Sequence, residues 1–539
     1  MLKKTHCLLV AVLGALAAGA SAQDLNTFTG RVQTIMNRPE YKHSSFGIEI
    51  YSLDSQQPLF RLNADKLFTP GSTTKLLTEG TALQLLGADY RFHTLIYRTG
   101  EIDRDGVLKG DIVLVASGDP NLSNRIQPDN TLAFEDEDHA YGGSEKTKAV
   151  PGDPLKVIRE FADQIAAKGI KKVDGKVLVD SSLFPDEGKE LGTGTEISSI
   201  AVNDNVVDVT IGAGAAEGAP ATMTVSPQTA YMKFVNKIIT SPAGGRQKLE
   251  GPVVVANPDG TSTVTLSGTA PLHSKVILYG YPVPEPVRFA ETVLAEVLAE
   301  RGISANLPRP DEKIEFGKYS QKYIPENVVA EHISPPFSEE IKVTLKVSQN
   351  LHASMIPYLL GSILGKARTN IDQAGFDLER GFLQKAGLDL SGASQADGAG
   401  GAASAFFTPD FMVHYLGYMA KQADYPLFHR ALPVLGRDGT LVDTQKNTPA
   451  AGKVFAKTGT YDAYDMLNKR IMLTGKGLAG YTTTQTGQHL AFALYVNRVG
   501  LPADDPDAAQ NTAGEALGEI AAAAYELPID KPVLDAHHP

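Results

Sequence analysis

Hydrophobic positions recur at helical spacing over several long segments. The first of these follows Pro70 and Gly71, which break the preceding element, and its leucines and alanines continue until Gly87. Ser72 is expected at or near the N-cap of this helix, where the positive end of the helix dipole favours a developing oxyanion. The same spacing predicts further helices over residues 154–168, 285–301, 355–364, 376–386, 409–423 and 508–525.

Alternation of apolar and polar residues predicts strands at both ends of the chain. A hairpin is expected over residues 45–62, directly before the first helix, and a second over residues 478–496. From about residue 92, short apolar runs separated by Gly, Pro, Asn and Asp predict a β-rich module with strands at 110–115, 173–180, 206–211 and 263–267. The polar residues 124–152 are expected to form a long surface loop, with little support for a function.

The order of these elements predicts a body that is split in sequence. Residues 23–92 and 283–535 would form one discontinuous catalytic domain, and residues 93–282 would form the inserted β-rich domain or domains. No fixed-period repeat is evident, so a solenoid is not favoured. A chain of 539 residues with 42% hydrophobic and 21% charged residues is long enough for two or three such cores.

Residues 1–22 have the pattern of an export signal. Lys3 and Lys4 precede an apolar run at 7–18, and a small-x-small site predicts cleavage after Ala22. A retained membrane anchor is the alternative, but this run is too short to span a bilayer. The single cysteine, Cys7, lies inside the signal, so the mature chain would have no disulfide, catalytic thiol or cysteine metal site. We therefore expect a periplasmic or secreted protein.

The net charge of the chain helps to decide which class of substrate or partner it binds. The formal net charge of −12 argues against a nucleic-acid partner, because phosphate binding needs a basic surface. A small-molecule or polymer substrate is more natural.

Ser72 and Lys75 are the first candidates for chemistry. Their spacing on a helix places a hydroxyl and an amine one turn apart on the same face. A serine hydroxyl becomes a nucleophile when a base takes its proton, and an amine whose pKa is lowered by burial can do this. Alone, the pair is better explained as a capping serine followed by a solvated lysine.

Two later motifs strengthen the first one. Ser348-Gln349-Asn350 follows residues 341–347, and Lys457-Thr458-Gly459-Thr460 follows residues 452–456. This order of Ser-x-x-Lys, Ser-x-Asn and Lys-Thr-Gly is the signature of the serine penicillin-recognising enzymes. A second Ser-x-Asn match, at residues 304–306, has no clear element around it.

Acyl transfer gives each residue of these motifs a role. Ser348 could relay a proton between Lys75 and the leaving group, and Asn350 could orient the substrate or Lys75. If the last motif lies on an edge strand beside Ser72, Lys457 and Thr458 can bind a terminal carboxylate and Gly459 leaves room for substrate. The N–H groups of Thr460 and Ser72 would then form an oxyanion hole. No histidine, metal or cofactor is required.

The chain resembles the D-alanyl-D-alanine carboxypeptidase/endopeptidase family of class C low-molecular-mass penicillin-binding proteins, the DacB-like or S13 serine peptidases. Segments 116–122, 200–205 and 432–441 and the final hairpin add to the three motifs, and the resemblance covers essentially the whole mature chain. It implies an α+β fold, in which a transpeptidase-like body with an antiparallel sheet flanked by helices carries inserted β-rich domains. It also implies a serine DD-peptidase that acts on peptidoglycan stem peptides and is acylated by β-lactam antibiotics.

Two features depart from the family pattern. Alanine replaces the serine of an Asp-Gly-Ser-Gly segment at Asp397-Gly398-Ala399-Gly400. Residues 461–477 are longer than usual and are expected to form an extra loop, which either shapes the substrate pocket or is decorative.

The sequence leaves several alternatives open. The same machinery occurs in β-lactamases and esterases, and a peptidoglycan-binding protein could keep the site without turnover. The balance of carboxypeptidase and endopeptidase action, the base for deacylation, a contact with the membrane surface or cell wall, and the oligomeric state are also open.

Overall fold

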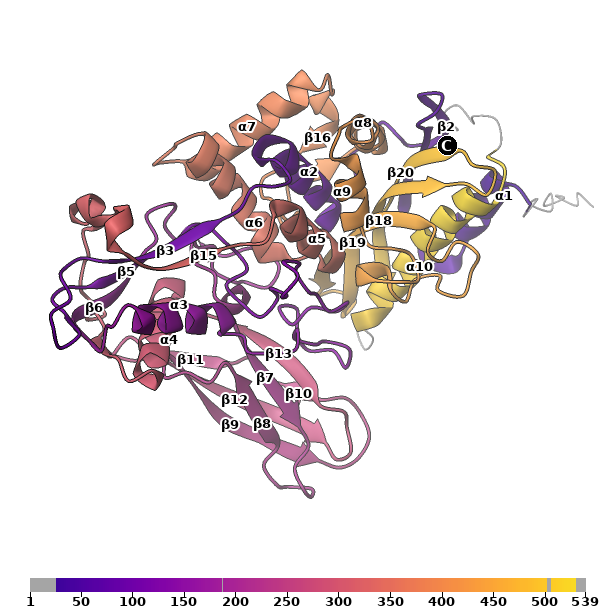
Figure 1. Ribbon diagram of the computed structural model, residues 1–539. Coiled ribbons are helices and arrows are strands. Elements are labelled where there is room, and N and C mark those ends of the chain that lie inside the picture. The colour runs from indigo at the N-terminus through magenta and orange to yellow at the C-terminus, as the bar shows by residue number, and fades with distance from the viewer. Residues whose placement is uncertain (1–25, 187, 502–505, 530–539) are drawn as a thin grey trace, which may run out of the picture.

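The computed structural model describes residues 26–186, 188–501 and 506–529. Figure 1 shows a body that holds both ends of the described chain and an inserted part that extends away from it. The predicted export signal, residues 1–22, lies outside the described residues. Within the described part, no helix combines the length and apolar character that crossing a membrane requires.

The body is built around a five-stranded antiparallel sheet in the order β18-β19-β20-β1-β2. Its strands are β1 (Ser45–Ser52), β2 (Gln57–Leu62), β18 (Val454–Asp465), β19 (Arg470–Thr483) and β20 (His489–Leu501). β20 pairs with β1 and places Val496 opposite Phe46, so segments from the two ends of the chain complete one sheet. Successive β20 side chains enter different cores, because Phe492 and Leu494 face one side and Tyr495 faces the other.

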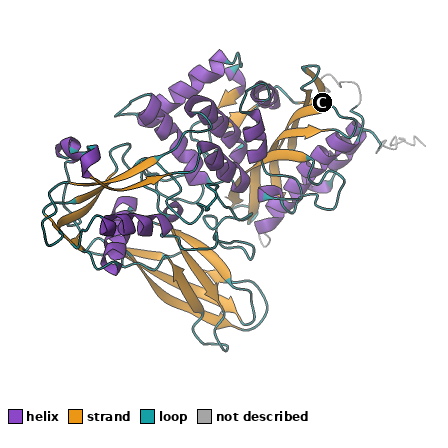
Figure 2. Cartoon of the chain, viewed as in Figure 1, coloured by secondary structure: helices purple, strands orange, loops and turns teal. Residues whose placement is uncertain are grey.

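Helices cover both faces of this sheet (Figures 1 and 2). On one face lie α1 (Phe28–Met36) and α10 (Pro506–Glu526). The other layer contains α2 (Thr74–Leu86), α5 (Phe337–Val347), α6 (Asn350–Leu359), α7 (Ile371–Lys385), α8 (Pro409–Met419) and α9 (Tyr425–Ala431). A two-stranded ladder joins β16 (Ala393–Ser394) to β17 (Phe406–Phe407). The predicted α+β class, an antiparallel sheet flanked by helices, is confirmed.

The inserted part contains three further sheets. The first has the order β14-β6-β5-β3-β15, with β4 paired to β6. Its strands are β3 (His93–Arg98), β4 (Val107–Leu108), β5 (Ile112–Val115), β6 (Lys172–Asp180), β14 (Ser304–Asn306) and β15 (Val328–Ile333). The second sheet joins β7 (Val206–Gly212), β8 (Thr222–Ser226) and β13 (Ile277–Pro282). The third joins β9 (Met232–Ser241), β10 (Lys248–Leu249), β11 (Val253–Ala256) and β12 (Ser262–Pro271).

The insert continues past the predicted boundary at residue 282. Helices α3 (Lys156–Ala167) and α4 (Pro286–Glu300) share one hydrophobic core with β5 and β6. β14 and β15 then complete the first inserted sheet. The predicted boundary at residue 282 therefore falls inside this packed unit. The sequence placed α4 in the body because of its helical pattern, but α4 buries its apolar face against inserted strands. The second Ser-x-Asn match is strand β14, at an edge of this sheet.

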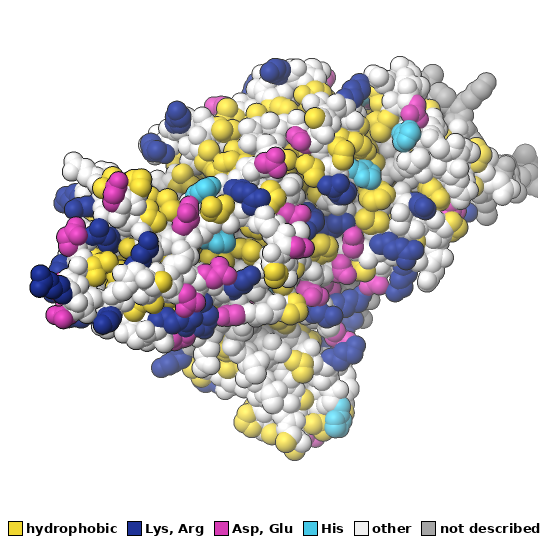
Figure 3. Space-filling view, in the orientation of Figure 1, with side chains coloured by type: hydrophobic (Ala, Val, Ile, Leu, Met, Phe, Trp, Pro, Cys, Tyr) yellow, Lys and Arg dark blue, Asp and Glu magenta, His cyan; other side chains and the backbone are white. Residues whose placement is uncertain are grey.

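The charged side chains of the surface are mixed in sign on the face that Figure 3 shows. Lys and Arg alternate with Asp and Glu over the insert and the body rather than gathering in one field.

The expected extra loop at residues 461–477 is instead a long hairpin. β18 and β19 stay paired from Thr460 opposite Lys476 to Asp465 opposite Arg470. Main-chain pairing thus extends the edge of the sheet, where residues 462–464 of β18 are exposed and the tip, with Met466 and Leu467, is more exposed still.

Residues 124–152 are irregular, as predicted, but only part of the segment is exposed, for example residues 128–130 and Tyr141. Arg125, Asp138 and His139 are only 2%, 1% and 4% exposed. The prediction of a surface loop was wrong for these three side chains, because their charges are paired with one another and with a residue far along the chain, Asp204.

The two-faced burial of β20 gives a stability prediction. Leu494→Ala should lower the free energy of unfolding of the body by about 2–5 kcal/mol, because a fully buried leucine leaves a cavity between sheet and helices. Urea unfolding followed by circular dichroism would measure it. Val254→Ala on β11, where the side chain is half exposed, is the control and should change stability by less than about 0.5 kcal/mol. Equal effects of the two substitutions would contradict this account of the core.

Candidate active site

Ser72 lies where a short 3₁₀ turn leads into a long helix. The turn spans Gly71–Thr73, and α2 begins at the next residue. Gly71 has φ +50°, a conformation that residues with a side chain rarely adopt. Ser72 is partly exposed, whereas the residues that follow it along α2 are buried. The nucleophile candidate is therefore accessible at the positive end of a helix.

Lys75 lies one turn further along the chain and is fully buried. Its Nζ atom is 2.8 Å from Ser72 Oγ, 2.6 Å from Asn350 Oδ1 and 3.1 Å from the carbonyl oxygen of Ala399. The amide and carbonyl oxygens only accept hydrogen bonds, so they use two hydrogens of the amine. A neutral amine then has one lone pair left, and the remaining partner, the Ser72 hydroxyl, can donate to it. This is the geometry of a base ready to take a proton from a serine.

Burial tunes Lys75 for this role. Desolvation lowers the pKa of Lys75 to about 8, although the acidic groups of Glu190, Asp397 and Glu79 act in the opposite direction. The amine is therefore partly neutral near physiological pH, which an exposed lysine is not.

A turn at residues 397–402 forms one wall around the amine. The Asp397 carboxylate accepts the backbone N–H groups of residues 399–402 at 2.6–3.1 Å and so fixes the turn. Lys75 binds the main-chain oxygen of Ala399. Replacing the family's serine with Ala399 therefore does not weaken this hydrogen bond, because either residue offers the same main-chain carbonyl.

The second motif forms the connection between α5 and α6. α5 ends at Val347, Ser348 adopts the left-handed conformation with φ 65° and ψ 32°, and α6 begins at Asn350. Ser348 Oγ lies 2.8 Å from the Nζ atom of Lys457. Of the two motif residues, Asn350 is thus the one bonded to Lys75, and Ser348 is bonded to the lysine of the third motif.

The third motif lies on β18, the edge strand of the sheet. A Cβ atom at Gly459 would be 2.0 Å from the carbonyl oxygen of Pro70, so only glycine lets the strand approach the start of α2 so closely. Thr458 Oγ1 donates to Thr440 Oγ1 at 2.9 Å. Lys457 is fully buried, and burial together with the charge of Lys75 lowers its pKa well below the ordinary value.

Lys476 is a third buried amine that the sequence did not reveal. It pairs with Thr460 across β18 and β19, and its Nζ atom is 2.6 Å from Thr460 Oγ1. Burial lowers the pKa of Lys476 to about 8. It was missed because it lies in the segment predicted to be a loop, and a lysine beside glycines gives no sequence signal of burial.

The three motifs meet in one place. The eight residues predicted from them are brought together at the junction of α2, the α5–α6 turn and β18: Ser72, Lys75, Ser348, Asn350, Lys457, Thr458, Gly459 and Thr460. Asp397, Ala399, Thr440 and Lys476 join the site only through the tertiary structure.

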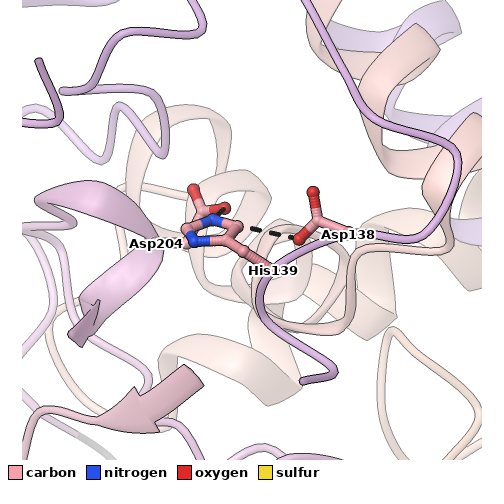
Figure 4. Close-up of side chains that lie close together, drawn as sticks. All are labelled: Asp138, His139 and Asp204. Atoms are coloured by element: carbon pink, nitrogen blue, oxygen red, sulfur yellow. Dashed lines mark hydrogen bonds and ion pairs between the residues drawn. The ribbon is translucent and has the colours of Figure 1, made fainter. Parts of the chain in front are cut away.

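A separate buried cluster has the composition of a metal site. Asp138, His139 and Asp204 lie close enough together to hold an ion (Figure 4). However, Arg125 Nη2 lies 2.5 Å from Asp138 Oδ2 and 2.6 Å from Asp204 Oδ2. The guanidinium already supplies the positive charge that two buried carboxylates need, so we assign no metal to this cluster.

Comparison with known proteins agrees with this site and fold. A model of the D-Ala-D-Ala carboxypeptidase 3 (S13) family matches residues 28–520. The D-alanyl-D-alanine carboxypeptidase of Actinomadura sp. strain R39 is 26% identical over 524 residues, covering 94% of this chain and 87% of that protein.

Solved structures share the fold. The structure of penicillin-binding protein 4 (dacB) from Haemophilus influenzae superposes with a TM-score of 0.70 at 20% identity, covering 92% of this chain and 98% of that one. Its complex with a β-lactam gives a TM-score of 0.66 at 20% identity, covering 91% and 98%. The family match spans nearly the whole described chain, and on this ground the chain belongs to the D-Ala-D-Ala carboxypeptidase 3 (S13) family.

Proposed function

We propose that the chain hydrolyses the D-Ala-D-Ala bond of peptidoglycan stem peptides through an acyl-enzyme on Ser72. The observation that carries this is the environment of Lys75, a buried amine with two obligate acceptors and a serine hydroxyl as third partner. Membership of a family of serine D-Ala-D-Ala carboxypeptidases supplies the substrate class.

The first half of the reaction forms the acyl-enzyme. Lys75 takes the Ser72 proton while Oγ attacks the carbonyl carbon, and the N–H groups of Ser72 and Thr460 stabilise the oxyanion. The C–N bond then breaks, and the departing D-alanine amine receives a proton through Lys75 or Ser348. The close contact between β18 and the start of α2 supports this pairing of donors, because a Cβ at Gly71 would be 2.5 Å from Thr460 N.

The terminal carboxylate of the substrate would be held by Lys457 and Thr458. Lys476 adds a second buried amine one strand away, so the region beside Thr460 is positive whenever either amine is protonated. Water then attacks the ester carbonyl and releases the acyl group. Lys75 and Ser348 are both candidates for the base in this step.

β-Lactam antibiotics are proposed inhibitors, because the same donors would hold a β-lactam carbonyl and carboxylate after ring opening. We also propose that residues 1–22 export the protein to the periplasm or beyond the cell, where its polymer substrate lies. The net charge of −12 and the mixed charges in Figure 3 support a substrate other than a nucleic acid.

Intact mass spectrometry with benzylpenicillin tests the proposal. The mature protein should gain the mass of one benzylpenicillin and keep it, and Ser72→Ala should gain none, because the ester needs that hydroxyl. Release of D-alanine from a pentapeptide should be lost in the same variant. An adduct that clears within seconds would indicate a β-lactamase, and a parent protein that gains no mass would overturn the role of Ser72.

The lowered pKa of Lys75 predicts how acylation depends on pH. The neutral amine is the active form, so the first-order acylation constant at saturating benzylpenicillin should rise with pH up to about 8 and level off above it. Below the pKa, each pH unit should change the constant about tenfold, since the neutral fraction changes by that factor. Stopped-flow kinetics from pH 5.5 to 9.5 would measure it.

Measurement at saturating benzylpenicillin separates the titration of Lys75 from that of Lys457 and Lys476, the two lysines proposed to bind the carboxylate. Loss of charge on Lys457 or Lys476 at higher pH should weaken the apparent affinity for the carboxylate and leave the first-order constant unchanged. A first-order constant that is flat from pH 6 to 9 would exclude Lys75 as the titrating base.

A further inference from the structure

Ser348 holds a conformation that its own chemistry does not favour. A serine with φ 65° and ψ 32° is in the left-handed region, which is unfavourable for a residue with a side chain and persists only where the surrounding structure holds it. The turn matters because it carries both Ser348, bonded to Lys457, and Asn350, bonded to Lys75. A shift of this turn would move two groups of the site together.

The first support for the turn comes from the insert. The hydroxyl of Tyr141 donates to the carbonyl oxygen of Ser348. Tyr141 belongs to the segment 124–152 that the sequence presented as a surface loop. A second contact of the same segment, from Asp136 Oδ1 to the N–H of Gly439 at 2.6 Å, ties it to the residue before Thr440.

The second support comes from Asp204, also in the insert. Its Oδ2 accepts from Gln349 Nε2 at 3.2 Å, and its Oδ1 is 3.1 Å from His352 Nε2. Gln349 in turn uses Oε1 to accept the N–H of Leu351 at 2.9 Å, which caps the start of α6. One carboxylate therefore holds the residue inside the Ser-x-Asn motif and a residue on the helix that follows.

The turn that carries Asp204 is fixed by its backbone conformation and by hydrogen bonds of its neighbours. Asn203, Asp204 and Asn205 all have positive φ, and the flanking asparagines hold the turn by bonds to Val206 O at 2.9 Å and Ile200 O at 3.0 Å. These residues fall in the segment 200–205 that contributed to the family resemblance but received no role.

Positive groups surround the carboxylate. Arg125 Nη2 lies 2.6 Å and His139 Nε2 2.9 Å from Asp204 Oδ2. On the other side, His352 Nδ1 is 2.9 Å from Glu340 Oε1 on α5. Burial opposes the charged form of His352, but the carboxylates of Glu340 and Asp204 raise its pKa to about 10. Arg125, His139, Asp204, His352 and Glu340 are thus linked through short contacts in one buried network, which holds the Asp204 carboxylate beside Gln349.

A loop of the insert also reaches the other end of the turn. A Cβ atom on Gly192 would be 2.0 Å from Asn350 Nδ2, so residues 190–193 pack directly on that amide. Glu190 folds this loop by accepting the N–H of Gly192 at 2.7 Å. The motif is thus contacted by three separate segments of the inserted part.

We propose that Tyr141 and Asp204 are positioning residues for acyl transfer, through which the inserted part holds the Ser348–Asn350 turn against Lys75 and Lys457. The insert is then a component of the catalytic machinery rather than only a module beside it. This inference rests on the proposed function, since it concerns the rate of the same acylation of Ser72.

Tyr141→Phe is the sharpest test, because it removes one oxygen atom and leaves the ring. The first-order acylation constant with benzylpenicillin should fall by on the order of tenfold or more, since small displacements of reacting groups cost that much. The noncovalent dissociation constant and the melting temperature should stay near those of the parent. A role in folding alone would instead lower the melting temperature and leave the acylation constant of the folded protein intact.

Tyr319→Phe is the matched control. Its hydroxyl also bonds within the insert, to Asp111 Oδ2 at 3.0 Å, but Tyr319 lies between two short 3₁₀ turns that connect β14 to β15 rather than at the Ser348–Asn350 turn. Its acylation constant should equal that of the parent. Gln349→Leu tests the turn from the Asp204 side and should also lower the first-order constant, so a folding defect in one variant leaves the other to decide.

Together, these variants distinguish failure of the positioning role from failure of the proposed function. If the parent is acylated and both Tyr141→Phe and Gln349→Leu react at the parent rate, the positioning role is overturned and the proposed function stands. If the parent itself is not acylated, the proposed function fails and this inference fails with it. A loss of rate in Tyr319→Phe equal to that in Tyr141→Phe would also overturn it, because the effect would then not be specific to the turn.

Discussion

The burial of one amine beside one hydroxyl is the constraint on which the rest of this site depends. Lys75 can act as a base only if it is kept dry, supplied with acceptors for its hydrogens and left with a lone pair toward Ser72. A carbonyl from the 397–402 turn and an amide from α6 meet these needs. The helix alone provides none of them, so the apparatus is a property of the packed body.

Burial also brings three lysines close together, and their positive charges would repel one another. Lys75, Lys457 and Lys476 are all buried, the charges of Lys75 and Lys476 act on Lys457, and each of the three has a lowered pKa. A lowered pKa leaves each amine neutral for more of the time, which reduces the repulsion among the three. A substrate carboxylate would offset the remaining positive charge of these amines, which favours ligands that end in a free carboxyl group.

Much of this could be predicted from the sequence. The helix at Ser72, the terminal hairpins, the inserted strands and the eight motif residues follow from local spacing and from side-chain chemistry, because helix faces and strand alternation are set within a few residues. The end of the insert could not be placed, since α4 has a helical pattern that fits either core. The hairpin at residues 461–477 was missed because strand pairing across β18 and β19 overrides its weak local pattern.

The sequence by itself determined which groups are available for chemistry: a serine one turn from a lysine, a second serine with an asparagine, and a lysine before a threonine and a glycine. Only the tertiary structure decided which of them touch, that Asn350 rather than Ser348 bonds to Lys75, and that Arg125, Asp138 and Asp204 are buried. The physical reason is that desolvation and charge pairing arise between segments far apart in the chain, and no local pattern records them.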